Sequence, residues 1–264
     1  MKLACQDSMV SGRDLNEKFD KIEQYGFEGV EVWGAQLLDD KTLSELERAL
    51  EGRGLKVSTI CAGYGGCLLD SDTEQRELAV NDIKRLLDIG GKIGAVGLIT
   101  VPVFGPPRIP DLRPLASATK LELDLLVEIC KELGEHAEKA GTLLLLEPLN
   151  RYETHLLNRL EQACEVCDRV DMSGVKMMAD FFHMNIEETD IAEAITGAKK
   201  HLRHIHLADS TRLLPGYGHT DFGAGFAALK QIGYDWFMSL ECGIPGEEEE
   251  DLPRCVKYLK ELMA

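Results

Sequence analysis

The segment "LLLLEPLNRYETH" (residues 143–155) places four consecutive leucines directly before an acid. A short run of branched apolar residues is typical of a strand that is buried on both faces in a parallel sheet. Glu147 follows the run, and Pro148 after it favours an extended backbone at Glu147. A second carboxylate, Glu153, lies six residues further along the chain. The segment therefore predicts a core strand that carries a carboxylate at its carboxyl end.

The same alternation of a short apolar run and a longer amphipathic segment recurs along the chain. The apolar runs are "KLAC" (2–5), "GVEVW" (29–33), "KVSTIC" (56–61), "AVGLITVPVF" (95–104), "TLLLLE" (142–147), "VKMMAD" (175–180), "LRHIHLAD" (202–209) and "WFMSLEC" (236–242). Helical patterns that end in glycine, such as "LNEKFDKIEQYGF", lie between most of them. This order predicts an α/β fold, a single (β/α)8 TIM barrel over residues 1–264. A doubly wound open sheet is the alternative, but no G-x-G-x-x-G follows the first run.

Composition and charge limit the kinds of molecule that the protein is expected to bind. The formal net charge is −17, from 29 basic and 46 acidic residues, which argues against nucleic-acid binding. No uncharged apolar stretch is long enough for a membrane span, and the first residues do not form a signal peptide. The eight cysteines, including the C-x-x-C of Cys164 and Cys167, are interpreted as free thiols. We therefore expect a cytoplasmic protein that binds neither nucleic acid nor membrane.

Each of the last four apolar runs carries a potential metal ligand at or near its carboxyl end. Glu147, Asp180, His206 and Glu241 are separated by 33, 26 and 35 residues, each about one strand–helix unit. In a barrel the carboxyl ends of the strands meet at one rim, so these side chains should gather there. Three carboxylates and one imidazole suit Mn²⁺, Mg²⁺ or Co²⁺ better than a structural zinc ion. A single acid at such a place is often only a helix cap, and His204 is interpreted as a hydrogen-bonded core residue.

Several longer motifs resemble a known family. They are "EPLNRYETH" (147–155), "DFFHMNIEE" (180–188), "HIHLAD" (204–209), R-x-x-P-G-x-G-H-x-D-F (212–222) and "IGYDWFMSLEC" (232–242). Together they resemble the xylose isomerase-like TIM-barrel superfamily of sugar isomerases and epimerases. Within it they are most similar to the D-tagatose 3-epimerase-like ketose 3-epimerases. The similarity covers residues 142–242, while the first half shares only the expected architecture.

The resemblance implies roles for individual residues. It implies four ligands for one divalent ion, with manganese expected before cobalt or magnesium: Glu147, Asp180, His206 and Glu241. It implies three contacts to the oxygens of a sugar: Glu153, His183 and Arg212. Glu147 and Glu241 would also be catalytic, one removing a proton beside the carbonyl and the other returning one on the opposite face. Trp33 and Phe104, at early strand ends, can give the sugar an apolar wall, although rim packing is the simpler interpretation of Phe104.

The expected reaction is C3 epimerisation of a ketose through a cis-enediolate. Aldose–ketose or hydroxypyruvate isomerisation, dehydration of a keto-inositol and elimination from a 3-keto-glycoside can use the same metal site. Two segments depart from the epimerase pattern: "SLECGIP" (239–245), at the end of the last run, and "VPVFGPPRIPDLRP" (101–114), after the fourth run. The identity of the carbohydrate substrate is therefore not decided by the resemblance. An apurinic endonuclease would need a three-zinc cluster, yet the first four runs contain no histidine. A non-catalytic barrel is a further alternative, and homo-oligomers are common among such barrels.

Overall fold

The chain folds into a closed barrel of eight parallel strands in sequence order, each paired with the next and the last paired with the first. The structure is a computed structural model that describes residues 1–264. The strands are β1 (Lys2–Gln6), β2 (Gly29–Trp33), β3 (Lys56–Cys61), β4 (Gly97–Thr100), β5 (Leu143–Leu146), β6 (Val175–Asp180), β7 (Leu202–Leu207) and β8 (Phe237–Leu240). The predicted (β/α)8 barrel is thereby confirmed, and the open-sheet alternative is wrong.

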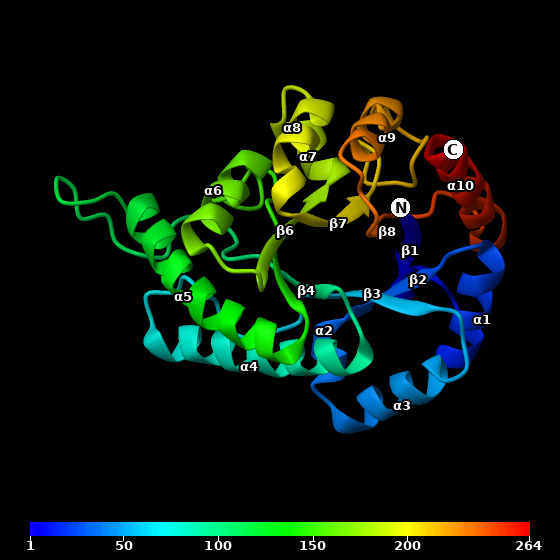
Figure 1. Cartoon of the computed structure of the whole chain (residues 1–264), viewed down its shortest axis with the longest axis horizontal. Helices are drawn as coiled ribbons and strands as arrows, with labels where there is room; N and C mark the ends of the chain where they lie inside the picture. The colour runs from blue at the N-terminus through cyan, green and yellow to red at the C-terminus, as the bar shows by residue number, and fades with distance from the viewer.

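The helices surround the strands as an outer layer (Figure 1). They are α1 (Leu15–Tyr25), α2 (Gly34–Leu37), α3 (Asp40–Leu50), α4 (Thr73–Ile93), α5 (Ala118–Ala140), α6 (Leu160–Val170), α7 (Phe181–Glu187), α8 (Ile191–Gly197), α9 (Phe222–Gln231) and α10 (Glu248–Met263), with short 3₁₀ turns η1 (Asp7–Met9) and η2 (Ala198–Lys200). Capping sets the bounds of α1: Asp14 accepts a hydrogen bond from the Glu17 backbone, and Gly26 at φ 95° ends the helix. No helix combines the length and the apolar character that crossing a membrane requires.

Strand β5 shows how the leucine run builds the core. Successive side chains of a strand point to opposite faces. Leu144 and Leu146 belong to the large apolar core shared with the helices, whereas Leu145 packs with Cys61, Ile99 and Met178 from three other strands. All three leucines are fully buried. The strand is therefore fixed from both sides, and the residue that follows it has a fixed position.

Strand β4 is shorter than its apolar run predicts. The run covers residues 95–104, but the strand is limited to Gly97–Thr100. Pro102 has no N–H to give to a neighbouring strand, which explains why pairing stops before it. The remaining residues start the long connection to α5, which projects from the barrel near the amino-terminal end of that helix (Figure 1).

Candidate active site

The four predicted metal ligands come together at the carboxyl ends of β5 to β8. One ligand atom from each of Glu147, Asp180, His206 and Glu241 lies within 4.8 Å of the others, and we call this set the ligand cluster. The Glu147 backbone N–H donates to the Thr100 carbonyl at 3.1 Å, which ties the residue to the adjacent strand. Asp180, His206 and Glu147 are buried, and Glu241 is partly exposed at the barrel mouth. Strand geometry, rather than a flexible loop, therefore positions these groups.

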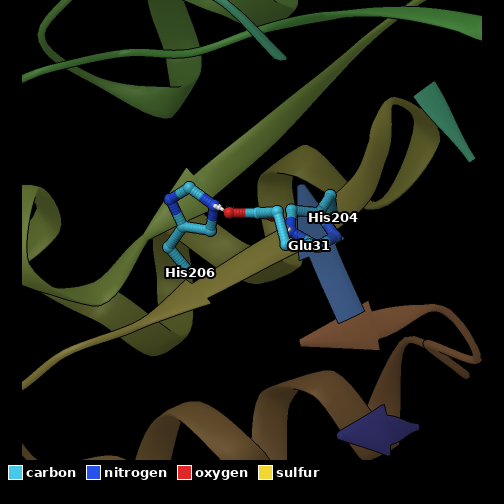
Figure 2. Close-up of side chains that lie close together, drawn as sticks. All are labelled: Glu31, His204 and His206. Carbon is cyan, nitrogen blue, oxygen red and sulfur yellow. Dashed lines mark hydrogen bonds and ion pairs between the residues drawn. The ribbon is translucent and has the colours of Figure 1, made fainter. Parts of the chain in front are cut away.

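Beneath the ligand cluster lies a buried carboxylate that the sequence analysis missed. Glu31, in the middle of β2, lies between two imidazoles (Figure 2). The Nε2 atoms of His204 and His206 each lie 3.0 Å from a Glu31 oxygen, and Thr59 Oγ1 donates to Glu31 at 2.5 Å. We call Glu31, Thr59, His204 and His206 the Glu31 cluster. The distances from Glu31 to Thr59, His204 and His206 are those of hydrogen bonds. His204 is fully buried, as expected of the hydrogen-bonded core residue that the sequence predicted.

The Glu31 contact decides which nitrogen of His206 faces the ligand cluster. Because Nε2 is engaged by Glu31, Nδ1 is the atom directed at the acids, 2.9 Å from Glu241 Oε2. It lies 3.7 Å from Glu147 and 3.8 Å from Asp180. Despite these distances Nδ1 is buried without a well-aligned hydrogen bond. A buried imidazole nitrogen that makes no well-aligned hydrogen bond and has three carboxylates within 3.8 Å fits a divalent ion that prefers oxygen and imidazole donors.

The two clusters impose opposite pKa shifts on their glutamates. Burial raises the pKa of Glu147 well above its ordinary value; the charge of His206 opposes this rise, and repulsion from Glu241 and Asp180 adds to it. Burial would also raise the pKa of Glu31, but the charge of His206 and hydrogen bonds from both histidines hold it well below its ordinary value. In the metal-free protein these surroundings favour the ionised form of Glu31 and the protonated form of Glu147.

Gln6 and Arg212 complete the surroundings of Glu241. Gln6 Nε2 donates to Glu241 at 2.8 Å and to Glu31 at 3.0 Å, so it joins the two clusters. Arg212 forms ion pairs with Asp180, at 2.5 Å, and with Glu241. Its guanidinium also lies 4.9 Å from the centre of the Phe182 ring. Arg212 was predicted to contact a sugar; here it lies at the ligand cluster and neutralises two of the three acids.

The other predicted sugar contacts lie on two sides of the mouth. His183, on α7, accepts hydrogen bonds at Nδ1 from the Asn150 backbone N–H, at 3.2 Å, and from the Asn150 side chain, at 2.8 Å. Asn150 also donates to Glu153 at 2.7 Å. Asn150 was not predicted, although it lies in the same motif as Glu147 and Glu153. Trp33 is 47% exposed at the end of β2, across the barrel from β6.

Comparisons with known proteins identify the family. The family described as "Xylose isomerase-like TIM barrel" matches residues 19–262. The chain is 33% identical over 250 residues to 3-dehydro-D-guloside 4-epimerase of Escherichia coli (strain K12), which is 94% of each chain. It is 33% identical over 239 residues to D-psicose 3-epimerase of Enterocloster bolteae, covering 86% of this chain and 76% of the relative. Among solved structures, 3-keto-D-glucoside 4-epimerase from E. coli superposes with a TM-score of 0.89 at 30% identity, over 99% of both chains.

These relatives are epimerases, so the prediction of an enzyme of the isomerase class is confirmed. The motifs of the second half thus indicated the correct superfamily and the correct branch within it. The match over residues 19–262 extends the likeness into the first half, where the sequence had indicated architecture alone. The chain belongs to the xylose isomerase-like TIM-barrel family.

Proposed function

We propose that this enzyme is a divalent-metal-dependent epimerase that inverts the carbon next to the ketone of a sugar. The ligand cluster is the observation that carries the proposal. It puts two glutamates, Glu147 after β5 and Glu241 after β8, on either side of Asp180 and His206 at one barrel mouth. Two carboxylates are what inversion requires, because one removes a proton from one face and the other delivers a proton to the opposite face.

Different residues carry out the separate parts of the inversion step. When bound, a divalent ion supplies positive charge that stabilises the negative charge developing on the sugar oxygens. Glu147 removes the proton as the carboxylate on one face of the sugar. Glu241 delivers a proton to the other face and is held in place by Gln6. The reverse reaction exchanges the two roles.

His183 is suited to donate a hydrogen bond to the reacting sugar. Its Nδ1 accepts from both donors of Asn150, so the proton of the neutral ring is on Nε2. Burial lowers the pKa of His183, which keeps the ring neutral. Nε2 lies 3.8 Å from Asp180, next to the ligand cluster. We assign His183 Nε2–H to a sugar oxygen, with Glu153, Arg212 and Trp33 as further sugar contacts.

Two substrate types fit this chemistry. A ketose has its ketone at C2 and would be inverted at C3, whereas a 3-keto-glycoside has it at C3 and would be inverted at C4. The ketose is the first expectation from the sequence motifs. The glycoside is favoured by the 3-dehydro-D-guloside 4-epimerase, whose alignment covers 94% of both chains. With either substrate, Glu147 and Glu241 would exchange protons with the carbon next to the ketone.

We further propose that the ion is manganese, that the protein is cytoplasmic and that it forms a homo-oligomer. Manganese is the first choice of ion because three carboxylates and one imidazole suit it. All eight cysteines are free thiols, which supports a reducing, cytoplasmic location. A homo-oligomer is predicted because similar barrels often form one. Light scattering, which measures the mass of the assembly in solution, checks this.

Proton NMR in deuterated water tests the reaction. With Mn²⁺ supplied and then removed before recording, candidate ketoses and 3-keto-glycosides should gain one deuterium at the carbon beside the ketone and give the epimer. Glu147→Gln and Glu241→Gln should each abolish epimer formation. Migration of the carbonyl would instead identify an isomerase, and release of the group attached at C1 would identify an eliminase. Epimer formed at the wild-type rate by both variants would refute the roles of the two glutamates.

A further inference from the structure

A polar groove leads away from the ligand cluster on the β1–β3 side of the barrel mouth. It begins as a cavity of about 220 Å³ bordered by Gln6, Trp33 and Cys61. A second cavity of about 640 Å³ continues it between α1 and α3. The two cavities share four lining residues: Asp7, Lys18, Val32 and Gln36. We call the pair the side groove, and its outer part has no role in the reaction proposed above.

The inner end of the side groove adjoins the reacting groups. Gln6, which lines it, donates to Glu241 Oε1 at 2.8 Å. Cys61 Sγ, on the same wall, lies 3.9 Å from that oxygen. The four ligands all come from β5 to β8, so the reacting ring lies on that half of the mouth. A substituent of this ring that points past Glu241 would enter the side groove over Gln6.

The lining of the groove suits a hydroxyl-rich group. Three polar side chains of the lining, Ser8, Asn16 and Gln36, form no hydrogen bond within the chain and can bind hydroxyls. Lys18 Nζ donates to the Asp7 carbonyl at 2.9 Å and pairs with the Asp7 carboxylate at 3.5 Å, which leaves one of its three N–H donors for a ligand. The exposed indole of Trp33 gives an apolar face for a ring. Polar side chains that line a cavity next to an aromatic surface are typical of a small-molecule site.

We propose that the side groove binds a second group of the substrate, a sugar ring or similar hydroxylated group joined to the keto-sugar by a glycosidic bond. The inference rests on the proposed function and, of its two substrate types, selects the 3-keto-glycoside over the free ketose. The glycosidic bond is not broken in this step. The attached group contributes binding energy remote from the reacting carbon, which holds that carbon between Glu147 and Glu241.

The test compares two glycosides that differ only in the attached group. The probes are the 3-keto derivatives of methyl β-glucoside and of cellobiose, oxidised on the non-reducing ring. We expect kcat/KM for epimerisation of the disaccharide to exceed that of the methyl glycoside at least tenfold. Gln36→Trp, which fills the groove, should lower this ratio at least tenfold. Gln231→Trp, the same change at an exposed glutamine on α9, should leave the ratio unaltered. Equal kcat/KM for the two probes, or a ratio unaffected by Gln36→Trp, would overturn the inference.

A binding measurement separates the groove from the reaction. Saturation-transfer NMR with unoxidised cellobiose reports which ring contacts the protein without any turnover. We expect saturation of the reducing ring in the wild type and in Gln231→Trp, and its loss in Gln36→Trp. If neither probe is epimerised but this pattern is found, the groove is supported and the proposed reaction fails. If the probes are epimerised but the reducing ring shows no saturation, the reaction is supported and the groove inference is overturned.

Discussion

The ligand cluster and the Glu31 cluster share His206 but differ in how their acids are satisfied. Glu31 accepts hydrogen bonds from Gln6, Thr59, His204 and His206. The Glu147 carboxylate accepts none, and its nearest cationic partner, His206 Nδ1, is 3.7 Å away. A buried acid without donors is costly unless it is protonated or bound to a cation. The difference supports the proposal that the ligand cluster binds the ion and transfers protons, while the Glu31 cluster holds the site in shape.

The largest expected effect comes from Glu147. In Glu147→Gln the base is lost, so kcat should fall by about 10²–10⁴-fold. The free energy of unfolding of the metal-free protein should not fall, because the Glu147 carboxyl accepts no hydrogen bond that the amide would lose. Steady-state kinetics and urea unfolding measure the two quantities. A variant that unfolds much more easily would show that Glu147 has a structural role like that of Glu31.

Glu31→Gln should behave in the opposite way. It leaves the imidazole of His206 without its buried counter-charge, and breaking such a pair costs about 3–5 kcal/mol of unfolding free energy. Affinity for Mn²⁺ should also fall about 10–100-fold, because the orientation of His206 is lost. Urea unfolding and calorimetric titration measure these changes. Thr59→Val is the matched control, since it removes one donor to Glu31 and should cost only about 1 kcal/mol. Equal effects of the two substitutions would contradict the proposed ranking.

Metal should stabilise the protein through the ligand cluster alone. Mn²⁺ at one hundred times its dissociation constant should add about 2.7 kcal/mol to the unfolding free energy. Thermal unfolding with and without a chelator measures this gain. In Asp180→Asn the gain should disappear, whereas Thr59→Val should retain it. Stabilisation that survives in Asp180→Asn would place the ion elsewhere.

The smallest effect concerns pH in the chelated protein. The folded state raises the pKa of Glu147 above its ordinary value of 4.5, so it binds a proton that the unfolded chain releases. The contribution of Glu147 to stability is present below that ordinary value and is lost as pH rises through the folded pKa. Glu147→Gln should therefore flatten the decline in stability above pH 4.5. Urea unfolding at several pH values checks this, and an unchanged slope would show that Glu147 does not titrate on unfolding.

The sequence predicted those parts of the site that strand ends determine. Glu147, Asp180 and Glu241 each follow or end an apolar run, and the period of the barrel brings such positions together. Glu31 was missed because it lies inside a run and its partner His206 is 175 residues away in the sequence. An acid flanked by valines in "GVEVW" was nevertheless a usable signal, because a buried charge needs partners. Gln6 and Asn150 escaped notice because neutral amides show no role until their neighbours are known.

The contacts of Arg212 also required three-dimensional information. The motif placed Arg212 near the sugar, but its pairing with Asp180 and Glu241 depends on how the loop after β7 turns back over the mouth. The backbone of Arg212 adopts φ 56°, a left-handed conformation that the sequence pattern does not reveal at an arginine. Side-chain direction after such a turn follows from the fold and not from residue spacing.

Titration of the chelated protein with Mn²⁺, followed by calorimetry, tests the central claim most directly. The wild type should bind one ion per chain, and Asp180→Asn, folded by circular dichroism, should bind none. Glu31→Gln should keep the stoichiometry and lose affinity, because its carboxylate supports a ligand without being one. A wild-type protein that binds no divalent ion, or an Asp180→Asn variant that binds it as tightly as the wild type, would contradict the account.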